Sequence, residues 1–316
     1  MPSLSTYWFE AAEGMIRRAG LRRSQAGRSV VSMLNSFVQL GLKVYFLFRA
    51  GPVEVEGQKM DRRTWAHGSF RSTLELLLGR YEPETTRLFH RLLRPGMTVL
   101  DVGAHGGYFS LIAASHVGPS GHVYAFEPHP ENFAALERNI ALNSYANITA
   151  FRQAIADRSG KLFLHLNSKG SDRYSLYPAQ DGADAESAEV EAITLDDFLA
   201  ARNWPQVDLL KMDIEGAEPS AIAGMSQALQ RGSIRNLVTE FSPPALAAAG
   251  CDPQSFLFRL AALGFDVSVL EGQAEPHVVP PPDFRSLAAS LRDQGGTNLL
   301  CQPVSPGSRR IVERVS

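Results

Sequence analysis

Cysteine is scarce in this chain of 316 residues, which contains two, Cys251 and Cys301. Two cysteines do not make a disulfide framework, and their spacing does not match a metal-binding motif. The low cysteine content is typical of proteins in a reducing compartment, and we expect a cytoplasmic location.

An excess of charge of one sign is also lacking. The formal net charge is −2, with 44% hydrophobic and 20% charged residues, which is ordinary for a soluble globular protein. The net charge therefore gives no argument for a nucleic-acid partner. The first ten residues lack the basic segment and apolar core of a secretory signal, so none is expected.

The first 50 residues differ from the rest in charge, because they hold seven basic residues and two glutamates. Apolar residues recur at helical spacing over residues 7–19 and again over 30–48. The second run carries a polar stripe, which argues against a lipid-spanning helix of about 20 mostly apolar residues. The stripe consists of Ser32, Asn35, Ser36, Gln39 and Lys43.

We therefore divide the chain into an N-terminal helical basic extension, residues 1–52, and one catalytic domain, residues 53–316. Two roles remain open for the extension. It packs on the domain or on a second subunit in a homodimer, or it makes peripheral contact with an anionic membrane surface.

A glycine-rich turn organises the remaining sequence. A buried strand is predicted over Thr98 to Val102, followed by Gly103, Gly106 and Gly107 and then by a helix. Such a corner lies at the carboxyl end of a strand, where nucleotide-type ligands bind. We expect its glycines to let a ligand approach main-chain N–H groups. The dinucleotide pattern G-x-G-x-x-G is absent, so a dinucleotide oxidoreductase is disfavoured.

Glu127 follows the next predicted strand, His122 to Phe126. It lies 20 positions after Gly107, where an acidic residue can accept hydrogen bonds from both ribose hydroxyls. A nucleoside ligand without phosphates is favoured over a dinucleotide, and S-adenosylmethionine is such a ligand.

Predicted strands and helices alternate after Thr98, which indicates a three-layer α/β fold with a mainly parallel sheet. The last two strands, Phe265 to Leu270 and Thr297 to Cys301, are expected to pair antiparallel. An inserted strand pair, Lys161 to Leu166 and Val190 to Thr194, flanks a polar loop. The other predicted strands of the main sheet span residues 148–152, 207–212 and 234–239, with Asp213 and Glu240 directly after the last two.

Several motifs together resemble the FkbM-type family of S-adenosylmethionine-dependent methyltransferases over roughly residues 55–303. They are Gly79 to Pro83, Asp101 to Phe109, Phe126-Glu127-Pro128, Lys211 to Glu218 and Thr297 to Cys301. One departure is His105, where the family more often has Asn. The resemblance implies a Rossmann-like class I methyltransferase sheet of seven strands. It also implies O-methylation of hydroxyls on small metabolites or on glycan sugars.

The cofactor site implied by the motifs has four parts. Glu127 is expected to bind the ribose, Gln153 and Ala154 to line the adenine edge, and Glu82 to lie near the amino acid end. The remaining expected cofactor residues are Asp101, Gly103, Ala104, His105, Gly107, Tyr108, Pro128 and Asp213. For Asp101 a purely structural role, bonding the N–H groups of the turn, is the alternative.

Methyl transfer to an alkyl hydroxyl requires a group that removes a proton. Asp213, Glu215 and Glu240 are the candidate catalytic residues, because they gather at neighbouring strand ends. Glu218 either adds to this acidic wall or favours the N-terminus of the following helix. His105 either titrates near neutrality or has a structural role.

Two other functions stay open. Asp213 and Glu240 could hold a divalent cation, as a catechol-type O-methyltransferase requires. No acidic residue directly follows Glu240, so we predict a metal-independent enzyme. A non-catalytic S-adenosylmethionine-binding scaffold is the other alternative. The loop from Asn167 to Ala188 is expected to cover the acceptor pocket, and the acceptor itself is left open.

Overall fold

The computed structural model describes residues 51–61, 64, 75–76, 79–166, 174–175, 187–272, 275–292 and 295–304. The N-terminal extension and most of the loop from Asn167 to Ala188 lie outside these residues, so both expectations stay predictions. Contacts divide the chain into two units, Met1–Tyr81 and Glu82–Ser316. Within the described residues, no helix combines the length and apolar character needed to cross a membrane.

The first unit contains a short hairpin. Strand β1 (Val53–Val55) pairs antiparallel with β2 (Gln58–Met60). The two turn residues, Glu56 and Gly57, both have positive φ angles, as a two-residue hairpin turn requires.

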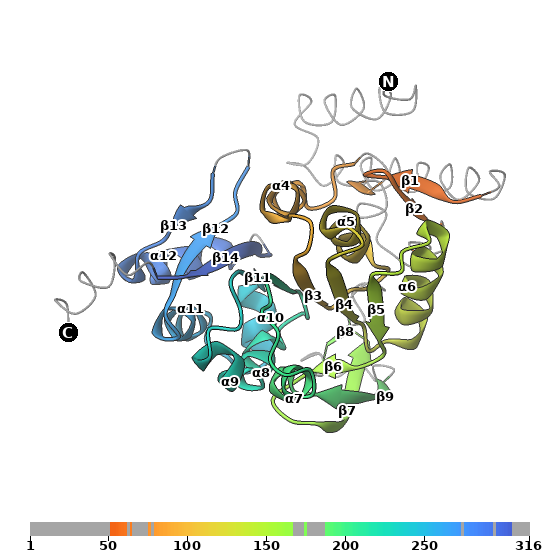
Figure 1. Ribbon diagram of the computed structural model, residues 1–316. Coiled ribbons are helices and arrows are strands. Elements are labelled where there is room, and N and C mark those ends of the chain that lie inside the picture. The colour runs from red at the N-terminus through yellow and green to blue at the C-terminus, as the bar shows by residue number, and fades with distance from the viewer. Residues whose placement is uncertain are drawn as a thin grey trace, which may run out of the picture. The chain divides into compact units, whose positions relative to one another are not determined.

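The second unit is built on an eight-stranded sheet with the order β13-β12-β14-β11-β10-β3-β4-β5 (Figure 1). Strands β3, β4, β5, β10 and β11 run parallel, and β14 runs antiparallel to both β11 and β12. The mainly parallel sheet with an antiparallel last strand is thereby confirmed. The expected number of seven strands is exceeded by one, the two-residue edge strand β13. The strands are β3 (Thr98–Val102), β4 (His122–Phe126), β5 (Ile148–Phe151), β10 (Leu209–Met212), β11 (Leu237–Phe241), β12 (Phe265–Val269), β13 (His277–Val278) and β14 (Thr297–Pro303).

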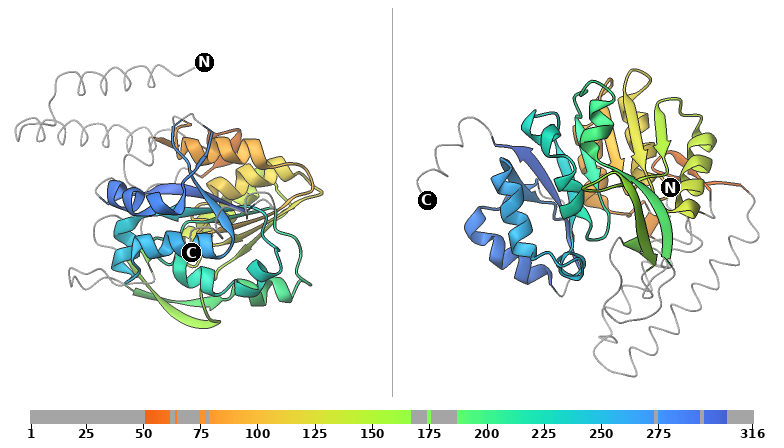
Figure 2. Two further views of the ribbon diagram at one scale, coloured as in Figure 1. Left: turned by 90° about the vertical axis from the view of Figure 1, so that its left-hand side faces the viewer. Right: turned by 90° about the horizontal axis from the view of Figure 1, so that it is seen from below.

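Helices cover both faces of this sheet, which makes three layers (Figures 1 and 2). One face carries α4 (Pro83–Leu92), α5 (Tyr108–Val117) and α6 (Pro130–Asn143). The other face packs into the main hydrophobic core. The elements on that side are α7 (Leu195–Ala200), α8 (Glu218–Ala223), α9 (Ser226–Gln230), α10 (Pro243–Ala248), α11 (Pro253–Ala262), the 3₁₀ turn η3 (Pro281–Asp283) and α12 (Phe284–Leu291).

A smaller sheet of four strands, in the order β6-β9-β7-β8, follows β5 in the sequence. Its strands are β6 (Ala154–Ile155), β7 (Gly160–Leu166), β8 (Tyr174–Ser175) and β9 (Ser187–Ile193). The inserted strand pair is confirmed, since β7 and β9 pair antiparallel along their length.

One strand boundary differs from the sequence prediction in a way that moves a site residue. Strand β11 begins at Leu237 and runs through Phe241, so Glu240 lies inside the strand and not after it. The ladder with β14 explains the shift, because it continues to the pair Phe241 and Thr297. Ile234, the predicted start, makes only an isolated bridge with Val207.

Candidate functional site

The glycine-rich turn after β3 is fastened to the end of β4 by its own main chain. The N–H groups of Gly103 and Ala104 both donate to the last carbonyl of β4, at 3.0 and 2.9 Å. The N–H of His105 donates to Glu127 Oε2 at 2.8 Å, and that of Gly107 to the Ala104 carbonyl at 2.7 Å. The expectation that the turn presents these N–H groups to a ligand is therefore wrong for these four residues. Their engagement is consistent with a ligand that carries no phosphate.

Gly103 brings the turn against the end of β10. Its φ is +81°, and a Cβ atom placed on it would lie 1.9 Å from the Asp213 carbonyl oxygen. Any side chain here would push β10 away from the turn. Gly107, the N-cap of α5, has a φ of +87°, and its Cβ would lie 2.6 Å from Leu136 Cδ1. Of the three predicted turn glycines, Gly103 is thus required by close packing against main chain, and Gly107 by its positive φ.

His105 has a φ of +48°, in the left-handed region. Among residues other than glycine, Asn, Asp and His are the ones enriched there. The His at this position therefore keeps the backbone conformation that an Asn would adopt. This local geometry supports the structural role for His105.

Glu127 lies directly after β4 and is 5% exposed. Its Oε1 accepts a hydrogen bond from the His129 N–H at 2.9 Å, and its Oε2 accepts the bond from His105. Burial raises the pKa of Glu127 to about 7, although the main-chain hydrogen bonds oppose the shift. A carboxylate offers about four lone-pair sites, so this one, which also accepts a bond from the Asn132 side chain, keeps capacity for a ligand hydroxyl. Pro128 is half-buried and lies between Glu127 and His129 in the chain.

Asp101 is buried inside β3. Its Oδ2 accepts a hydrogen bond from the Ser110 hydroxyl of α5 at 2.6 Å, so the contact is to that helix and the alternative of bonding the turn N–H groups is wrong. Its Oδ1 is buried and has no hydrogen-bond partner within the described residues. Burial raises the pKa of Asp101, and the Lys211 ammonium opposes this. A buried acceptor of this kind fits a ligand that brings its own donors.

Two of the other predicted cofactor residues, Tyr108 and Ala154, have side chains that pack or bond within the protein. Tyr108 is buried, and its hydroxyl lies 3.2 Å from Thr86 Oγ1, which joins α5 to α4. Ala154 packs in the core of the small sheet, and Gln153 is half-buried just before it. The roles of these residues stay predictions.

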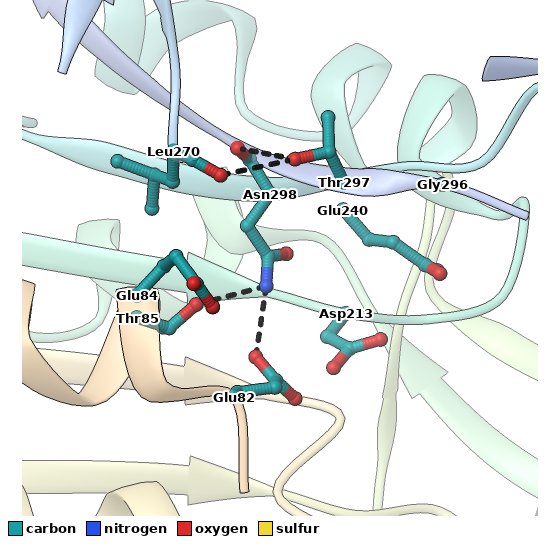
Figure 3. A pocket seen from close by; sticks show the side chains of 9 residues that line it. All are labelled: Glu82, Glu84, Thr85, Asp213, Glu240, Leu270, Gly296, Thr297 and Asn298. Atoms are coloured by element: carbon teal, nitrogen blue, oxygen red, sulfur yellow. Dashed lines mark hydrogen bonds between the residues drawn. The ribbon is translucent and has the colours of Figure 1, made fainter. Parts of the chain in front are cut away.

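A polar cavity of about 290 Å³ opens at the carboxyl end of β10 (Figure 3). It lies where β10, β11 and β14 meet the start of α4. Most of its lining is carboxylate, hydroxyl or amide. The lining residues are Glu82, Glu84, Thr85, Asp213, Glu240, Leu270, Gly296, Thr297 and Asn298.

Asn298 connects two distant parts of the chain across this cavity (Figure 3). Its Nδ2 donates to Glu82 Oε2 at 2.8 Å and to Thr85 Oγ1 at 2.9 Å. Desolvation raises the pKa of Glu82 to about 7, with Lys211 acting in the opposite direction. Sequence reasoning assigned no role to Asn298 or Thr85. The signal was present for Asn298, because it belongs to the motif Thr297 to Cys301.

The three predicted catalytic carboxylates come together at the edge of this cavity. Oxygen atoms of Asp213, Glu215 and Glu240 all lie within 4.8 Å of one another, and each side chain is half-buried. Glu215 has a φ of +53°, and Glu82 has a φ of +39° just before Pro83. Left-handed residues other than glycine cost about 1–3 kcal/mol each and cluster at functional sites.

Glu218 does not line the cavity and instead bonds to the turn between β10 and α8. It is 1% exposed, and its Oε1 accepts a hydrogen bond from the Ile214 N–H at 3.0 Å. Burial raises the pKa of Glu218 to about 8. Of the two predicted roles, the structural one at the start of α8 agrees with this position.

Comparisons with known proteins agree with this geometry. Residues 101–303 match the Methyltransferase FkbM domain. The chain is 31% identical over 176 residues to 31-O-demethyl-FK506 methyltransferase FkbM of Streptomyces tacrolimicus. That match covers 47% of this chain and 66% of the relative, just under two thirds of its length. This chain is also 26% identical over 190 residues to the 2-O-methyltransferase NoeI of Sinorhizobium fredii, a match that covers 54% of this chain and 76% of that protein.

A solved FkbM methyltransferase from Methylobacillus flagellatus is 15% identical, with a TM-score of 0.40, and covers 76% of this chain and 57% of that one. The family match extends over more than half of the chain and includes the glycine turn, Glu127, the acidic residues and β14. This chain therefore belongs to the FkbM family of S-adenosylmethionine-dependent methyltransferases.

Proposed function

We propose that this protein methylates a hydroxyl group on a small metabolite or a glycan sugar, without a metal ion and with a carboxylate as the base. The observation that carries the proposal is the convergence of Asp213, Glu215 and Glu240 within 4.8 Å beside a polar cavity. The names of two relatives, a 31-O-demethyl-FK506 methyltransferase and a 2-O-methyltransferase, support oxygen as the acceptor atom.

The residues on the β3 and β4 side fit the methyl donor. Glu127 would hold the ribose hydroxyls, because both of its oxygens are fixed by main-chain N–H groups. The buried Oδ1 of Asp101 and the carboxylate of Glu82 would accept from the ammonium of the amino acid portion. When bound, S-adenosylmethionine supplies a methyl group that its sulfonium charge has already activated.

The acidic residues on the other side would complete the reaction. The acceptor hydroxyl loses its proton to a carboxylate while its oxygen forms a bond to the methyl carbon, and the carbon–sulfur bond breaks. The products are a methyl ether, S-adenosylhomocysteine and a protonated carboxylate. Orienting the hydroxyl in line with the donor is the second task of the cavity wall.

The same three carboxylates have the spacing that the divalent-metal alternative requires. One of them, Asp213, already pairs with the Lys211 ammonium at 3.0 Å, and this positive charge opposes cation binding there. We expect methyl transfer to survive exhaustive treatment with EDTA. Loss of turnover with EDTA and recovery with magnesium would instead establish the catechol-type mechanism.

The charge of the cavity bears on which acceptors enter it. Its lining includes Glu82, Glu84, Asp213 and Glu240, so an anionic acceptor would meet repulsion whereas a neutral hydroxyl-rich one would find acceptors and donors. We expect tritiated methyl groups to be transferred from labelled S-adenosylmethionine to neutral sugars in preference to matched uronic acids. Exclusive labelling of uronic acids would contradict this assignment. Binding of S-adenosylhomocysteine without transfer to any hydroxyl acceptor would favour the non-catalytic scaffold.

The basic residues 1–50 motivate a separate proposal about partners. We propose that this segment contacts anionic membrane or a second subunit. Binding to vesicles that contain anionic lipid should fall as salt is raised, and deleting residues 1–50 should abolish it while sparing cofactor binding. A protein that ignores such vesicles at low salt and that elutes as a monomer would contradict both forms of the proposal.

A further inference from the structure

A lysine is buried in the middle of the main sheet. Lys211 lies in β10, with Asp101 of β3 and Val238 of β11 as its neighbours in register, and it is 3% exposed. Successive side chains of a strand point to opposite faces. Leu210 and Met212 belong to the main core, so Lys211 faces the other layer, which holds α5.

The end of the side chain has two close contacts. Lys211 Nζ lies 4.7 Å from the centre of the Phe109 ring of α5. It also lies 3.0 Å from Asp213 Oδ2, in an ion pair whose lysine is 3% exposed and whose aspartate is 26% exposed. The pair thus runs from the interior of the sheet to the edge of the cavity.

Lysine is among the residues least often found fully buried, and an unpaired buried ammonium is strongly unfavourable. Here burial by itself lowers the pKa of Lys211, but the carboxylates of Asp213, Glu82 and Asp101 raise it well above its usual value. Lys211 therefore remains charged. A methionine would fill similar space without this electrostatic cost, so the retained charge calls for a reason.

The interaction is reciprocal. Lys211 lowers the pKa of Glu82 and of Asp101, against the effect of their burial. These carboxylates come from different elements: Asp101 from β3, Glu82 from the residue before α4, and Asp213 from the end of β10. One buried cation is thus shared by three site carboxylates.

We propose that Lys211 is a positioning residue of the methyl-donor site, acting through Asp213. Its ammonium holds Asp213 by Oδ2 and leaves Oδ1 for the ligand at the edge of the cavity. The inference rests on the proposed function, which places Asp213 beside the reacting groups, and on the expectation that Asp213 also contacts the cofactor. It adds a residue that touches neither ligand but fixes the orientation and charge of one that does.

The test is a double-mutant cycle with S-adenosylhomocysteine binding as the readout, measured by titration calorimetry. Lys211→Met should weaken binding by at least about tenfold, and Asp213→Asn by a similar factor. The Lys211→Met/Asp213→Asn variant should bind no more weakly than Asp213→Asn, because the lysine then has nothing to position. Lys211→Arg, which keeps the charge, should retain more affinity than Lys211→Met.

Leu209→Met is the matched packing control, because Leu209 lies on the same strand and on the same face as Lys211, and is buried. It should bind with wild-type affinity. Unchanged binding in Lys211→Met, or losses in the double variant that are the product of the two single losses, would overturn the proposal.

If Lys211→Met does not fold, the double variant Lys211→Met/Asp213→Asn tests the proposal in its place. It lacks both charges of the ion pair, so it does not leave the Asp213 carboxylate without its partner. Folding with the affinity of Asp213→Asn supports the proposal, and failure to fold overturns it. Wild-type binding of S-adenosylhomocysteine is measured in every case. Failure of the proposed hydroxyl chemistry would appear separately, as the absence of methyl transfer by a wild-type protein that binds the cofactor product.

Discussion

The two sides of β10 solve the problem of holding polar groups in different ways. On the β3 and β4 side, main-chain N–H groups take a large part: two of them donate to Glu127, and the turn N–H groups bond to the end of β4. The side chains of Ser110 and Asn132 add bonds to Asp101 and Glu127. On the side of the cavity, side chains do it: Asn298 holds Glu82, and Lys211 holds Asp213. Two of the acidic residues there also adopt left-handed backbone conformations.

This difference suits two tasks: binding a cofactor that is always the same, and selecting an acceptor that differs between enzymes. A carboxylate fixed by main-chain donors keeps its geometry when neighbouring side chains change, which suits a cofactor that is always the same. A carboxylate fixed by other side chains can be redirected by a single substitution. We therefore place acceptor selectivity around Glu240 and Asn298, and cofactor recognition at Glu127, Asp101 and Glu82. Asp213 lies between these two parts of the site.

The largest expected effect is on the cavity side. Asp213→Asn and Glu240→Gln keep size and hydrogen bonding but remove the charge, so replacing the true base should lower kcat by about 10²- to 10⁴-fold. Turnover is measured with an acceptor found among the neutral sugars, and cofactor affinity is followed in parallel. Glu84→Gln is the control, because Glu84 lines the same cavity and also pairs with Arg87.

Asp213→Asn is also expected to weaken cofactor binding, so turnover is compared at saturating cofactor. If Asp213→Asn then turns over normally, Asp213 is only a cofactor ligand and Glu240 or Glu215 is the base. Full turnover in the amide variants of all three residues would refute the acidic wall.

On the cofactor side, Glu127→Ala should weaken binding of S-adenosylhomocysteine by tens-fold. The loss of a charge-assisted pair of ribose bonds corresponds to about 1.5–3 kcal/mol. Calorimetric titration measures it, with Glu131→Ala as a control, since Glu131 is an exposed acidic residue of the nearby helix α6. Unchanged affinity in Glu127→Ala would remove this residue from the site.

Glu218 offers a test of the structural role that its burial indicates. Its pKa rises from 4.5 to about 8 on folding, because of burial. The unfolded chain therefore releases this proton first as pH rises, and the protein loses stability between about pH 4.5 and 8. Glu218→Gln lacks this loss, so its stability relative to the wild type should grow over that range by up to about 5 kcal/mol and then level off. Chemical denaturation at several pH values measures it; a constant difference would contradict the assignment.

The smallest expected effect is at His105. Its φ of +48° suits His and Asn alike, so His105→Asn should change the free energy of unfolding by less than about 0.5 kcal/mol. His105→Val should destabilise by about 1–2 kcal/mol, because a β-branched residue is disfavoured in this region. Thermal unfolding compares the three proteins. A large loss of cofactor binding in His105→Asn would show that the imidazole itself takes part.

Much of the fold and part of the site could be predicted from local patterns. Alternating strands and helices indicate a parallel sheet, and the carboxyl ends of neighbouring parallel strands meet at one edge. This rule correctly predicts that Asp213 and Glu240 lie close together, and the strand pattern correctly places Glu127 after β4. Such predictions succeed because they depend on strand direction and length, which the sequence encodes locally.

The features that could not be predicted depend on pairing between distant segments. Asn298 bonds to Glu82 across 216 positions, a contact that exists only because β14 lies between β12 and β11. The same insertion extends β11 and takes Glu240 into the strand. Lys211 is hidden in an apolar run, and its role becomes visible only when Asp101, Glu82 and Asp213 are seen around it.

A crystal structure with S-adenosylhomocysteine bound tests the central claim most directly. We predict that the ribose hydroxyls bond to Glu127 and that the sulfur faces across β10 towards the cavity edged by Asp213 and Glu240. The space beyond the sulfur would then be the acceptor site. A ligand whose ribose does not contact Glu127, or one whose sulfur faces away from Asp213 and Glu240, would contradict this account.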